Sequence, residues 1–259
     1  MFIFDFDGVL MDSADEASVT AYNAATGAEA RSPEEFPPGL AERFRRNRFH
    51  AQDASGMFSL MAGCLETGGA DSGAQMTAAE YRRLLEGATL PAETRRERFF
   101  AARRRFQADD PIGWLELNRP YPGIREAVRR RGSERLVLLT SKNRDATLAL
   151  CRHFGLDVPG ENVFSGDGGA KKSDNLDRIH ERYGRNRYVF IDDHLENLRE
   201  VNVRARERGI ALSPVLALWG YTGPDAAGAA EKSGFRTISR EALIAALESG
   251  SETFDPAKT

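Results

Sequence analysis

The feature that most constrains the fold is a set of short, continuous apolar runs, one at the start of the chain and three in its second half. The first run is Phe2–Phe6, and it ends at Asp7-Gly8. The later runs are Leu136–Thr140, Tyr188–Asp192 and Val215–Trp219. Runs without polar alternation are typical of strands covered on both faces. Helical stretches that stop at a glycine separate the later runs: Arg144–Phe154, Ser173–Tyr183 and Leu195–Arg208. This strand–helix alternation predicts a parallel α/β sheet.

Residues 14–118 interrupt the alternation, because they contain helical patterns and no convincing strand. The expected helices are Ala14–Thr26, Pro38–Phe49, Gly56–Leu65, Thr77–Glu86 and Pro91–Ala108, with a glycine-rich loop at Thr67–Ala74. We therefore predict an all-helical domain at 14–118, inserted into an α/β domain made of residues 1–13 and 119–248. Residues 249–259 are expected to form a flexible tail.

Composition excludes several classes of protein. No apolar run approaches the ~18–20 residues of a membrane span, and the N-terminus lacks the basic residues of a signal peptide. A net charge of −3 argues against a generic nucleic-acid binder. Cys64 and Cys151 have no metal-binding spacing, so we expect buried thiols. These features predict a cytoplasmic globular protein, monomeric or homodimeric, without nucleic-acid or membrane partners.

Acidic pairs follow two of the predicted strands. Asp5 and Asp7 are separated by one residue and followed by glycine, while Asp192 and Asp193 end the run that begins at Tyr188. The carboxyl ends of parallel strands meet at one edge of a sheet, where α/β proteins bind ligands. Like charges held this close need a cation or a shared proton. Two acidic strand ends therefore indicate a hard-cation site, for which Mg²⁺ is the best candidate.

Two further loops indicate an anion. Thr140-Ser141 follows a strand and precedes a helix, so its hydroxyls and backbone amides could cradle a phosphate. Lys171-Lys172 opens another helix, where lysine opposes the helix dipole and needs another reason to be present. The chain has five lysines against 31 arginines, yet Lys142, Lys171 and Lys172 all fall in these two loops. A compact ammonium at these places suits a phosphoryl group.

In this order, the motifs resemble those of the haloacid dehalogenase superfamily, in its phosphoglycolate-phosphatase-like branch with a helical cap inserted after strand one. The first motif reads Asp5-Phe6-Asp7-Gly8-Val9-Leu10-Met11-Asp12-Ser13, and Thr140, Lys171 or Lys172, and Asp192-Asp193 match the next three. Tyr121-Pro122-Gly123 and Trp219-Gly220-Tyr221 are similar to further habits of that branch. The resemblance covers nearly the whole chain and implies a Rossmann-like core.

The resemblance implies a Mg²⁺-dependent phosphatase that acts on a small phosphorylated metabolite. Asp5 would be the nucleophile that forms an aspartyl-phosphate, and Asp7 the general acid and then base. Asp5, Asp7 and Asp193, with Asp192, would hold the metal. Thr140, Ser141 and a lysine would bind the phosphoryl oxygens.

Several assignments stay open at this point. Lys172 is preferred over Lys171 because Leu176, Ile179 and Tyr183 follow it at +4, +7 and +11. The fourth motif has Asp192 where glycine is common, so the outer metal ligand is Asp192, Glu196 or Asn197. The arginine clusters at 43–48, 95–98 and 103–105 are interpreted as solvated helix faces, with the alternative that one or two arginines contact the substrate. Met57, Phe58, Leu60, Met61 and Leu65 are expected in the core of the helical domain.

Other functions are less consistent with the residues. A dehalogenase has no need of Asp7, and a phosphonatase needs a Schiff-base lysine where residues 2–118 contain none. A sugar phosphomutase would use the same aspartyl-phosphate chemistry and stays open. A catalytically inert binding protein on the same fold is the remote alternative, since every motif acid and the lysine are present.

Overall fold

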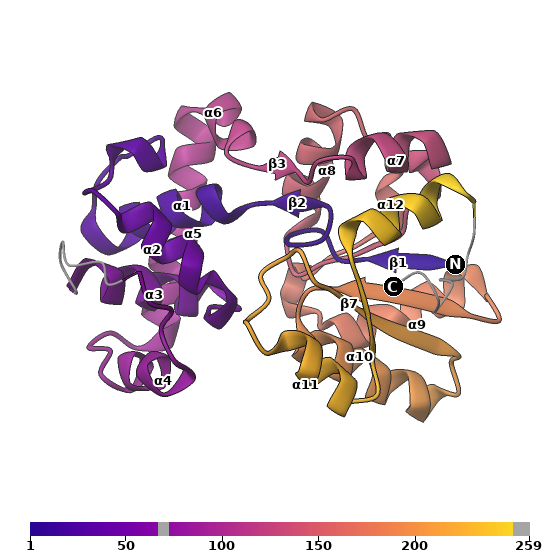
Figure 1. Cartoon of the computed structure of the whole chain (residues 1–259). Helices are drawn as coiled ribbons and strands as arrows, with labels where there is room; N and C mark the ends of the chain where they lie inside the picture. Colours follow the sequence, from indigo (N-terminus) through magenta and orange to yellow (C-terminus); the bar gives the residue numbers. More distant parts are fainter. Residues whose placement is uncertain (67–72, 251–259) are drawn as a thin grey trace. The chain divides into compact units, whose positions relative to one another are not determined.

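The computed structural model describes residues 1–66 and 73–250, and these form two compact units (Figure 1). One unit, here the α/β unit, combines Met1–Asp12 with the chain from Pro120 onward. The other, the helical unit, is Ser13–Arg119. The predicted glycine-rich loop and C-terminal tail lie outside the described residues, except for residues 73–74 and 249–250.

The α/β unit is built on a six-stranded sheet with the order β5-β4-β1-β6-β7-β8, in which every neighbouring pair is parallel. Its strands are β1 (Phe2–Phe4), β4 (Leu138–Leu139), β5 (Val163–Phe164), β6 (Tyr188–Asp192), β7 (Leu212–Ala217) and β8 (Arg236–Ile238). A separate two-stranded sheet pairs β2 (Met11–Asp12) with β3 (Arg119–Pro120). The predicted parallel α/β fold class is thereby confirmed.

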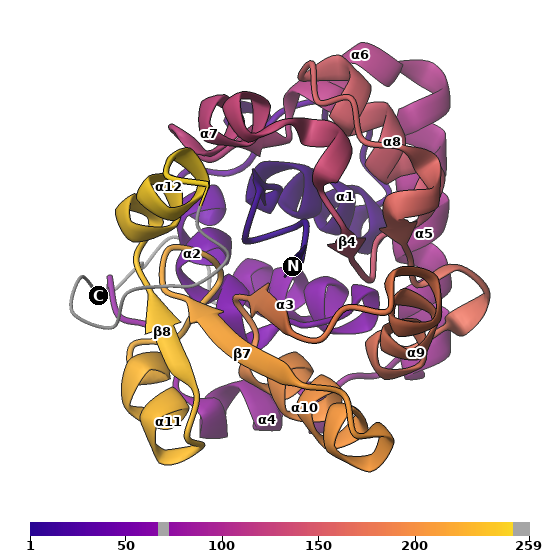
Figure 2. The same ribbon diagram turned by 90° about the vertical axis from the view of Figure 1, so that its right-hand side faces the viewer.

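Helices cover both faces of this sheet, with α9, α10 and α11 on one side and α7, α8 and α12 on the other (Figures 1 and 2). Their bounds are α7 Ile124–Arg131, α8 Arg144–His153, α9 Lys172–Tyr183, α10 Leu195–Arg208, α11 Ala226–Lys232 and α12 Arg240–Glu248. Apolar side chains of α9 and α10, such as Leu176 and Leu198, pack with Ile3 and Phe190 of the central strands, and all four are fully buried. Burial of both sheet faces explains why the strand sequences lack polar alternation.

The helical unit contains α1 (Ala14–Thr26), α2 (Leu40–Asn47), α3 (Ala54–Glu66), α4 (Ala78–Glu86), α5 (Ala92–Asp109) and α6 (Pro111–Glu116). Short 3-10 helices occur at Pro33–Glu35 and Arg48–His50 here, and at Ser133–Arg135, Gly160–Asn162 and Asp167–Gly169 in the α/β unit. The predicted helix Pro38–Phe49 is therefore shorter than expected and ends in a 3-10 turn. The Thr77 side chain starts α4 by accepting the Glu80 amide, while the Glu80 carboxylate accepts the Thr77 amide in return.

A buried carboxylate joins three helices of the helical unit. Glu16 of α1 is fully buried, and its Oε1 accepts hydrogen bonds from Arg103 Nε at 2.8 Å and Trp114 Nε1 at 3.0 Å. The Thr20 hydroxyl donates to the same oxygen, and Arg103 Nη2 donates to Oε2 at 2.7 Å. The interpretation of the arginine clusters as solvated faces is therefore wrong for Arg103. It is also wrong for Arg43 and Arg95, which are buried because the helices pack over them.

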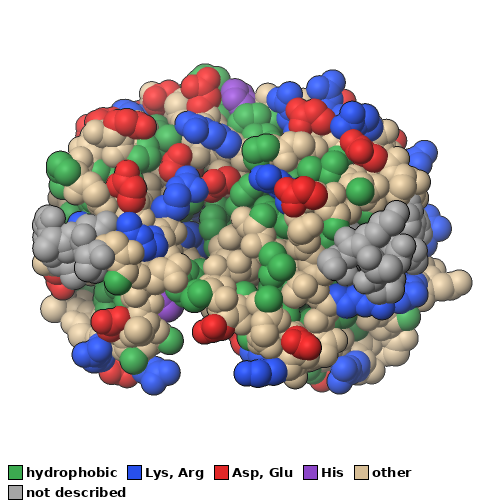
Figure 3. Space-filling model, in the orientation of Figure 1, with side chains coloured by type: hydrophobic (Ala, Val, Ile, Leu, Met, Phe, Trp, Pro, Cys, Tyr) green, Lys and Arg blue, Asp and Glu red, His purple; other side chains and the backbone are tan. Residues whose placement is uncertain are grey.

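The surface agrees with the charge balance of the sequence. Figure 3 shows acidic and basic side chains intermixed over the visible face. No helix in the described part of the chain is long and apolar enough to cross a membrane. Cys64 and Cys151 are free thiols and both are buried, as predicted. Among the expected apolar residues of the helical unit, Phe58, Leu60 and Met61 are buried.

Candidate active site

The sheet topology brings three of the sequence motifs to one edge. Asp5 directly follows β1, Thr140 directly follows β4, and Asp192 is the last residue of β6. Because β4, β1 and β6 are neighbours in a parallel sheet, the three strands end side by side. Residues separated by more than 180 positions in the sequence thus share one site, as the motifs predicted.

Lys172 lies at the centre of this site. Its Nζ is 3.0 Å from Asp5 Oδ2 and 2.6 Å from Asp192 Oδ2, and its side chain is almost fully buried. It is the first residue of α9, whose buried Leu176 and Ile179 fix the helix against the sheet. Lys171, one residue earlier, is exposed. The structure thus brings Lys172 to the acidic residues and leaves Lys171 at the surface.

The buried charges of the site do not balance. Asp5, Asp192 and Asp193 each offer a carboxylate oxygen within 4.8 Å of the others, and all three are buried. The Lys172 ammonium contacts two of these carboxylates, Asp5 and Asp192, and with every group ionised these four groups sum to a charge of −2. Burial raises the pKa of Asp5 well above its usual range, with Asp192 and Asp193 adding to the effect against the opposing influence of Lys172. Burial would lower the pKa of Lys172, but Asp192 and Asp5 raise it, so the lysine stays protonated.

Asp192 and Asp193 differ in their partners although they are neighbours. Asp192 accepts hydrogen bonds from the Lys172 ammonium, the Asn197 amide group at 3.1 Å and the His194 backbone amide at 2.7 Å. The Asp193 carboxylate is bound by a different loop, since its Oδ2 accepts the Tyr221 backbone amide at 2.6 Å. Asp192 therefore orients Lys172, which accounts for an acid at a position where glycine was the expected residue.

Two glycines make room for the Asp193 carboxylate. Gly8 has a φ of +85°, and a Cβ on it would lie 2.0 Å from Asp193 Oδ2. A Cβ on Gly220 would lie 2.2 Å from the Gly8 carbonyl oxygen and 2.6 Å from Asp193 Oδ2. Any side chain at either position would collide with the site. The loop after β7 and the loop after β1 are thus fitted around Asp193.

Asp7 and the second motif form the more open side of the site. Lys142 Nζ is 3.3 Å from Asp7 Oδ1, and Lys142 is buried while Asp7 is half-buried. The Thr140 hydroxyl accepts the Lys142 backbone amide at 3.1 Å, which orients the loop after β4. Ser141 is exposed. An acid with a lysine partner and a nearby threonine hydroxyl can transfer a proton beside a bound anion.

The remaining sequence candidates lie away from this cluster, or act in it differently than expected. Glu196 is exposed and forms an ion pair with Arg199, so it is separated from the carboxylates. Asn197 reaches the site, but through its amide donor to Asp192. The pairing of Lys142 with Asp7 and the contact of Tyr221 with Asp193 were not predicted. Two sequence features could have indicated these contacts. Lys142 is a rare lysine in the loop of the second motif, and Tyr221 ends the Trp219-Gly220-Tyr221 run.

Comparisons with known proteins found a matching family model and several solved structures. A family model described as a haloacid dehalogenase-like hydrolase matches residues 1–200. No curated protein matches the chain. A predicted phosphatase from Clostridium acetobutylicum superposes with a TM-score of 0.58 at 15% identity, over 94% of this chain and 95% of that one. Protein Tyrosine Kinase A from Mycobacterium tuberculosis gives 0.54 at 18% identity, over 95% and 96% of the two chains. An L-2-haloacid dehalogenase from Xanthobacter autotrophicus gives 0.42 at 13% identity, over 99% and 89%.

Proposed function

The chain belongs to the haloacid dehalogenase-like hydrolase family, and from that premise we propose that it is a Mg²⁺-dependent phosphatase of a small phosphorylated metabolite. The observation that carries this proposal is the excess of buried carboxylate around Asp5. Three carboxylates whose oxygens lie within 4.8 Å of one another repel when they are ionised, and a bound cation relieves that repulsion. The excess of two negative charges fits a divalent cation.

The residues present suit Mg²⁺ in kind as well as in charge. Oxygen ligands from carboxylates are those that Mg²⁺ prefers, and it binds through few protein ligands while keeping several waters. Asp5 and Asp193 would hold it, with the Asp7 backbone carbonyl, since Asp192 is occupied by Lys172, Asn197 and the His194 amide. When bound, the ion would screen the charge of the nucleophile from that of the phosphate.

In the first half of the reaction, an Asp5 carboxylate oxygen attacks phosphorus and the bond from phosphorus to the ester oxygen breaks. Asp7 donates a proton to that leaving oxygen, so an alcohol departs and an aspartyl-phosphate remains on Asp5. Lys172 and the Thr140 hydroxyl, with the Ser141 backbone amide, neutralise and orient the phosphoryl oxygens. The protonated state of Lys172 supports this role.

In the second half, Asp7 takes a proton from a water molecule as that water attacks phosphorus. The bond from phosphorus to the Asp5 oxygen breaks, which releases inorganic phosphate and restores the Asp5 carboxylate. Asp7 is suited to both halves because it lies two residues from Asp5 on the open side of the site. A dehalogenase has no leaving alkoxide to protonate, so Asp7 and its lysine partner favour the phosphatase.

The helical unit, which the sequence inserts between Asp12 and Pro120 of the α/β unit, would correspond to the helical cap of that family. The C. acetobutylicum protein with a similar fold is called a predicted phosphatase, which supports the proposed reaction type. We expect the cap to select the substrate by its leaving group. The chemistry at Asp5 needs only a phosphate monoester.

The test is a screen of phosphorylated metabolites with the purified full chain, measured as phosphate release with Mg²⁺ and with excess EDTA. The expected result is release from at least one metabolite with Mg²⁺, loss of that activity in EDTA and its return when Mg²⁺ is restored. Formation of an isomerised sugar phosphate without phosphate release would replace the phosphatase by a phosphomutase. Activity that is unchanged by EDTA would contradict the metal assignment.

A further inference from the structure

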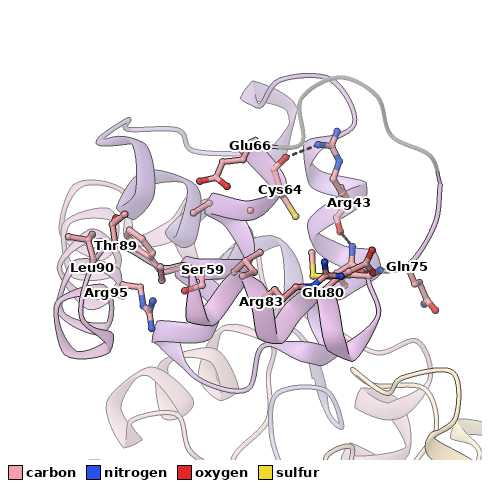
Figure 4. Close-up of a pocket in the computed structure, with 18 of the residues that line it drawn as sticks. Arg43, Ser59, Cys64, Glu66, Gln75, Glu80, Arg83, Thr89, Leu90 and Arg95 are labelled. Carbon is pink, nitrogen blue, oxygen red and sulfur yellow. Dashed lines mark hydrogen bonds between the residues drawn. The ribbon is translucent and has the colours of Figure 1, made fainter.

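The helical unit contains a cavity of about 670 Å³, which is in the range of small-molecule binding sites (Figure 4). Residues of α2, α3, α4 and α5 line it, together with the segments that flank α4. Its apolar wall includes Phe58, Ala62, Leu84 and Leu90. All of the described residues that line it belong to the helical unit, and none of them is a residue of the carboxylate cluster.

Arg95 of α5 lines the cavity and is in an unusual state. Only 7% of its surface is exposed, and its Nε has no hydrogen-bond partner. Within residues 1–66 and 73–250, no recorded hydrogen bond or ion pair uses its guanidinium group. Arg103, two turns later on the same helix, donates from two nitrogens to the buried Glu16. The two arginines therefore differ in that only Arg103 has a carboxylate partner of its own.

Nearby polar groups do not neutralise Arg95. Glu80 accepts the backbone amide and the hydroxyl of Thr77 as a helix cap, and Glu66 is exposed. Burial, with the Asp53 carboxylate adding to it, raises the pKa of the Tyr81 phenol to about 12 against the opposing charges of Arg48 and Arg95, so the phenol is uncharged at neutral pH. The Asp53 carboxylate itself accepts the Gly56 backbone amide. A buried guanidinium without a counter-ion is unfavourable, and its planar donor fork is suited to a carboxylate.

The side chains around Arg95 indicate the rest of the ligand. Figure 4 shows Arg95 on the same side of the cavity as Ser59, Thr89 and Leu90, with Arg43 at the opposite end. The Ser59 hydroxyl donates to the Ser55 carbonyl, so the Arg95 guanidinium and the Thr89 hydroxyl are the donors that suit a single carboxylate, and the apolar wall suits a hydrocarbon body. We propose that this cavity binds a small amphipathic carboxylate, whose head group pairs with Arg95 while its apolar part packs against Phe58, Leu84 and Leu90.

The probes for the test are octanoate and benzoate, with octan-1-ol and benzyl alcohol as uncharged counterparts of the same size. The measurement is the thermal unfolding midpoint of the full chain. A ligand that binds only the folded state raises this midpoint as its concentration rises. We expect at least one of the two carboxylates to raise it by about 2 °C or more near saturation, and its alcohol to have a much smaller effect.

The key variant is Arg95→Met, which keeps the length of the side chain and removes its charge. We expect this variant to lose the stabilisation by carboxylate and to unfold at a higher temperature than the parent without ligand, because an unpaired buried cation is gone. Arg98→Met is the matched control, since Arg98 is an exposed arginine on the same helix. It should keep the full response to the carboxylate.

A second variant keeps the proposal testable if Arg95→Met does not fold. Ala62→Trp fills the cavity without changing Arg95, and it should also lose the response. The proposal is overturned if neither carboxylate stabilises the parent, or if the response survives in Arg95→Met or in Ala62→Trp. These readouts do not depend on catalysis, so Asp5→Asn should respond to the carboxylate as the parent does, whatever the outcome for the proposed phosphatase.

Discussion

Both units of this protein bury an ionic cluster, and the two clusters differ in how their charges are matched. In the helical unit, Glu16 is fully buried and receives hydrogen bonds from Thr20, Arg103 and Trp114. In the α/β unit, three buried carboxylates converge, Lys172 contacts two of them, and burial raises the pKa of Asp5. One cluster satisfies its carboxylate from within the protein, and the other leaves negative charge in excess.

This difference separates a structural carboxylate from a functional one. A buried carboxylate with matched donors stabilises the fold, and its loss leaves its partners unpaired. A buried carboxylate in excess makes the empty site unfavourable until a cation or a substrate arrives, and such groups are concentrated at catalytic sites. Burial alone does not distinguish the two cases, whereas the balance of partners does.

The largest expected effect is on turnover in Asp5→Asn. This change removes the nucleophile, so we expect phosphate release with Mg²⁺ to fall by at least ~10³-fold. The thermal unfolding midpoint should not decrease, because the change also removes one carboxylate from a cluster that has too many. Steady-state kinetics and a melting curve on the same preparation check both points. Near-parental turnover in this variant would refute the nucleophile assignment.

Glu16→Gln should show the opposite behaviour. Removing the charge from a fully paired buried carboxylate typically costs about 3 kcal/mol of unfolding free energy. Urea unfolding followed by circular dichroism measures that loss. Turnover per folded molecule should stay within about threefold of the parent, since Glu16 belongs to the helical unit and not to the carboxylate cluster around Asp5. A large loss of turnover with unchanged stability would remove the distinction between the two clusters.

Lys172→Met tests the cation that contacts Asp5 and Asp192. We expect a loss of turnover of about 10²-fold, because a preorganised charge that stabilises the transferring phosphoryl group has effects of this size. Lys171→Met is the matched control, and we expect less than about a threefold change because Lys171 is exposed. Equal losses in the two variants would show that charge near the site matters rather than the position of Lys172.

Gly220→Ala is expected to have the smallest effect of the four. Its Cβ would lie 2.2 Å from the Gly8 carbonyl oxygen and 2.5 Å from Asp193 Cβ, so the backbone at Gly8 and the Asp193 side chain must both shift. We expect Mg²⁺ activation to require about tenfold more metal, since small displacements of metal ligands and their supports have effects of this size. The Mg²⁺ dependence of the initial rate measures it. Gly228→Ala, at a glycine with open space around it and no positive φ, changes no metal contact and serves as the control.

Much of the fold could be predicted from local patterns. The strand Tyr188–Asp192 and the helices Ala14–Thr26 and Leu195–Arg208 occur with the predicted bounds. Each of these segments has a strong pattern over its whole length. The strands Val163–Phe164 and Arg236–Ile238 were missed, because two or three residues at a sheet edge are too few to form a pattern. The strand expected at Leu136–Thr140 is assigned only over Leu138–Leu139, although the Val137 carbonyl accepts the Phe4 amide and the Thr140 amide donates to the Phe164 carbonyl.

The sequence predicts which residues belong to the site, but not which of them pair with one another through hydrogen bonds and ion pairs. The acids, Thr140 and Lys172 follow strands or open a helix, so their motifs locate them at one sheet edge. The role of Asp192 in orienting Lys172 depends on a contact over 20 positions, and the pair of Glu16 with Arg103 depends on one over 87. Such partners are chosen by tertiary packing. The arginines therefore could not be sorted into solvated and buried ones beforehand.

The most direct test of the central claim is mass spectrometry of the acid-quenched Asp7→Asn variant after mixing with p-nitrophenyl phosphate and Mg²⁺. This substrate has a good leaving group, so the first half of the reaction needs no proton from Asp7, whereas the second half still needs a base. The aspartyl-phosphate on Asp5 should then accumulate, and the added phosphoryl group should be found on the peptide that contains Asp5. A phosphoryl group on a different residue, or none on Asp5 while the parent turns over the same substrate, would contradict the account.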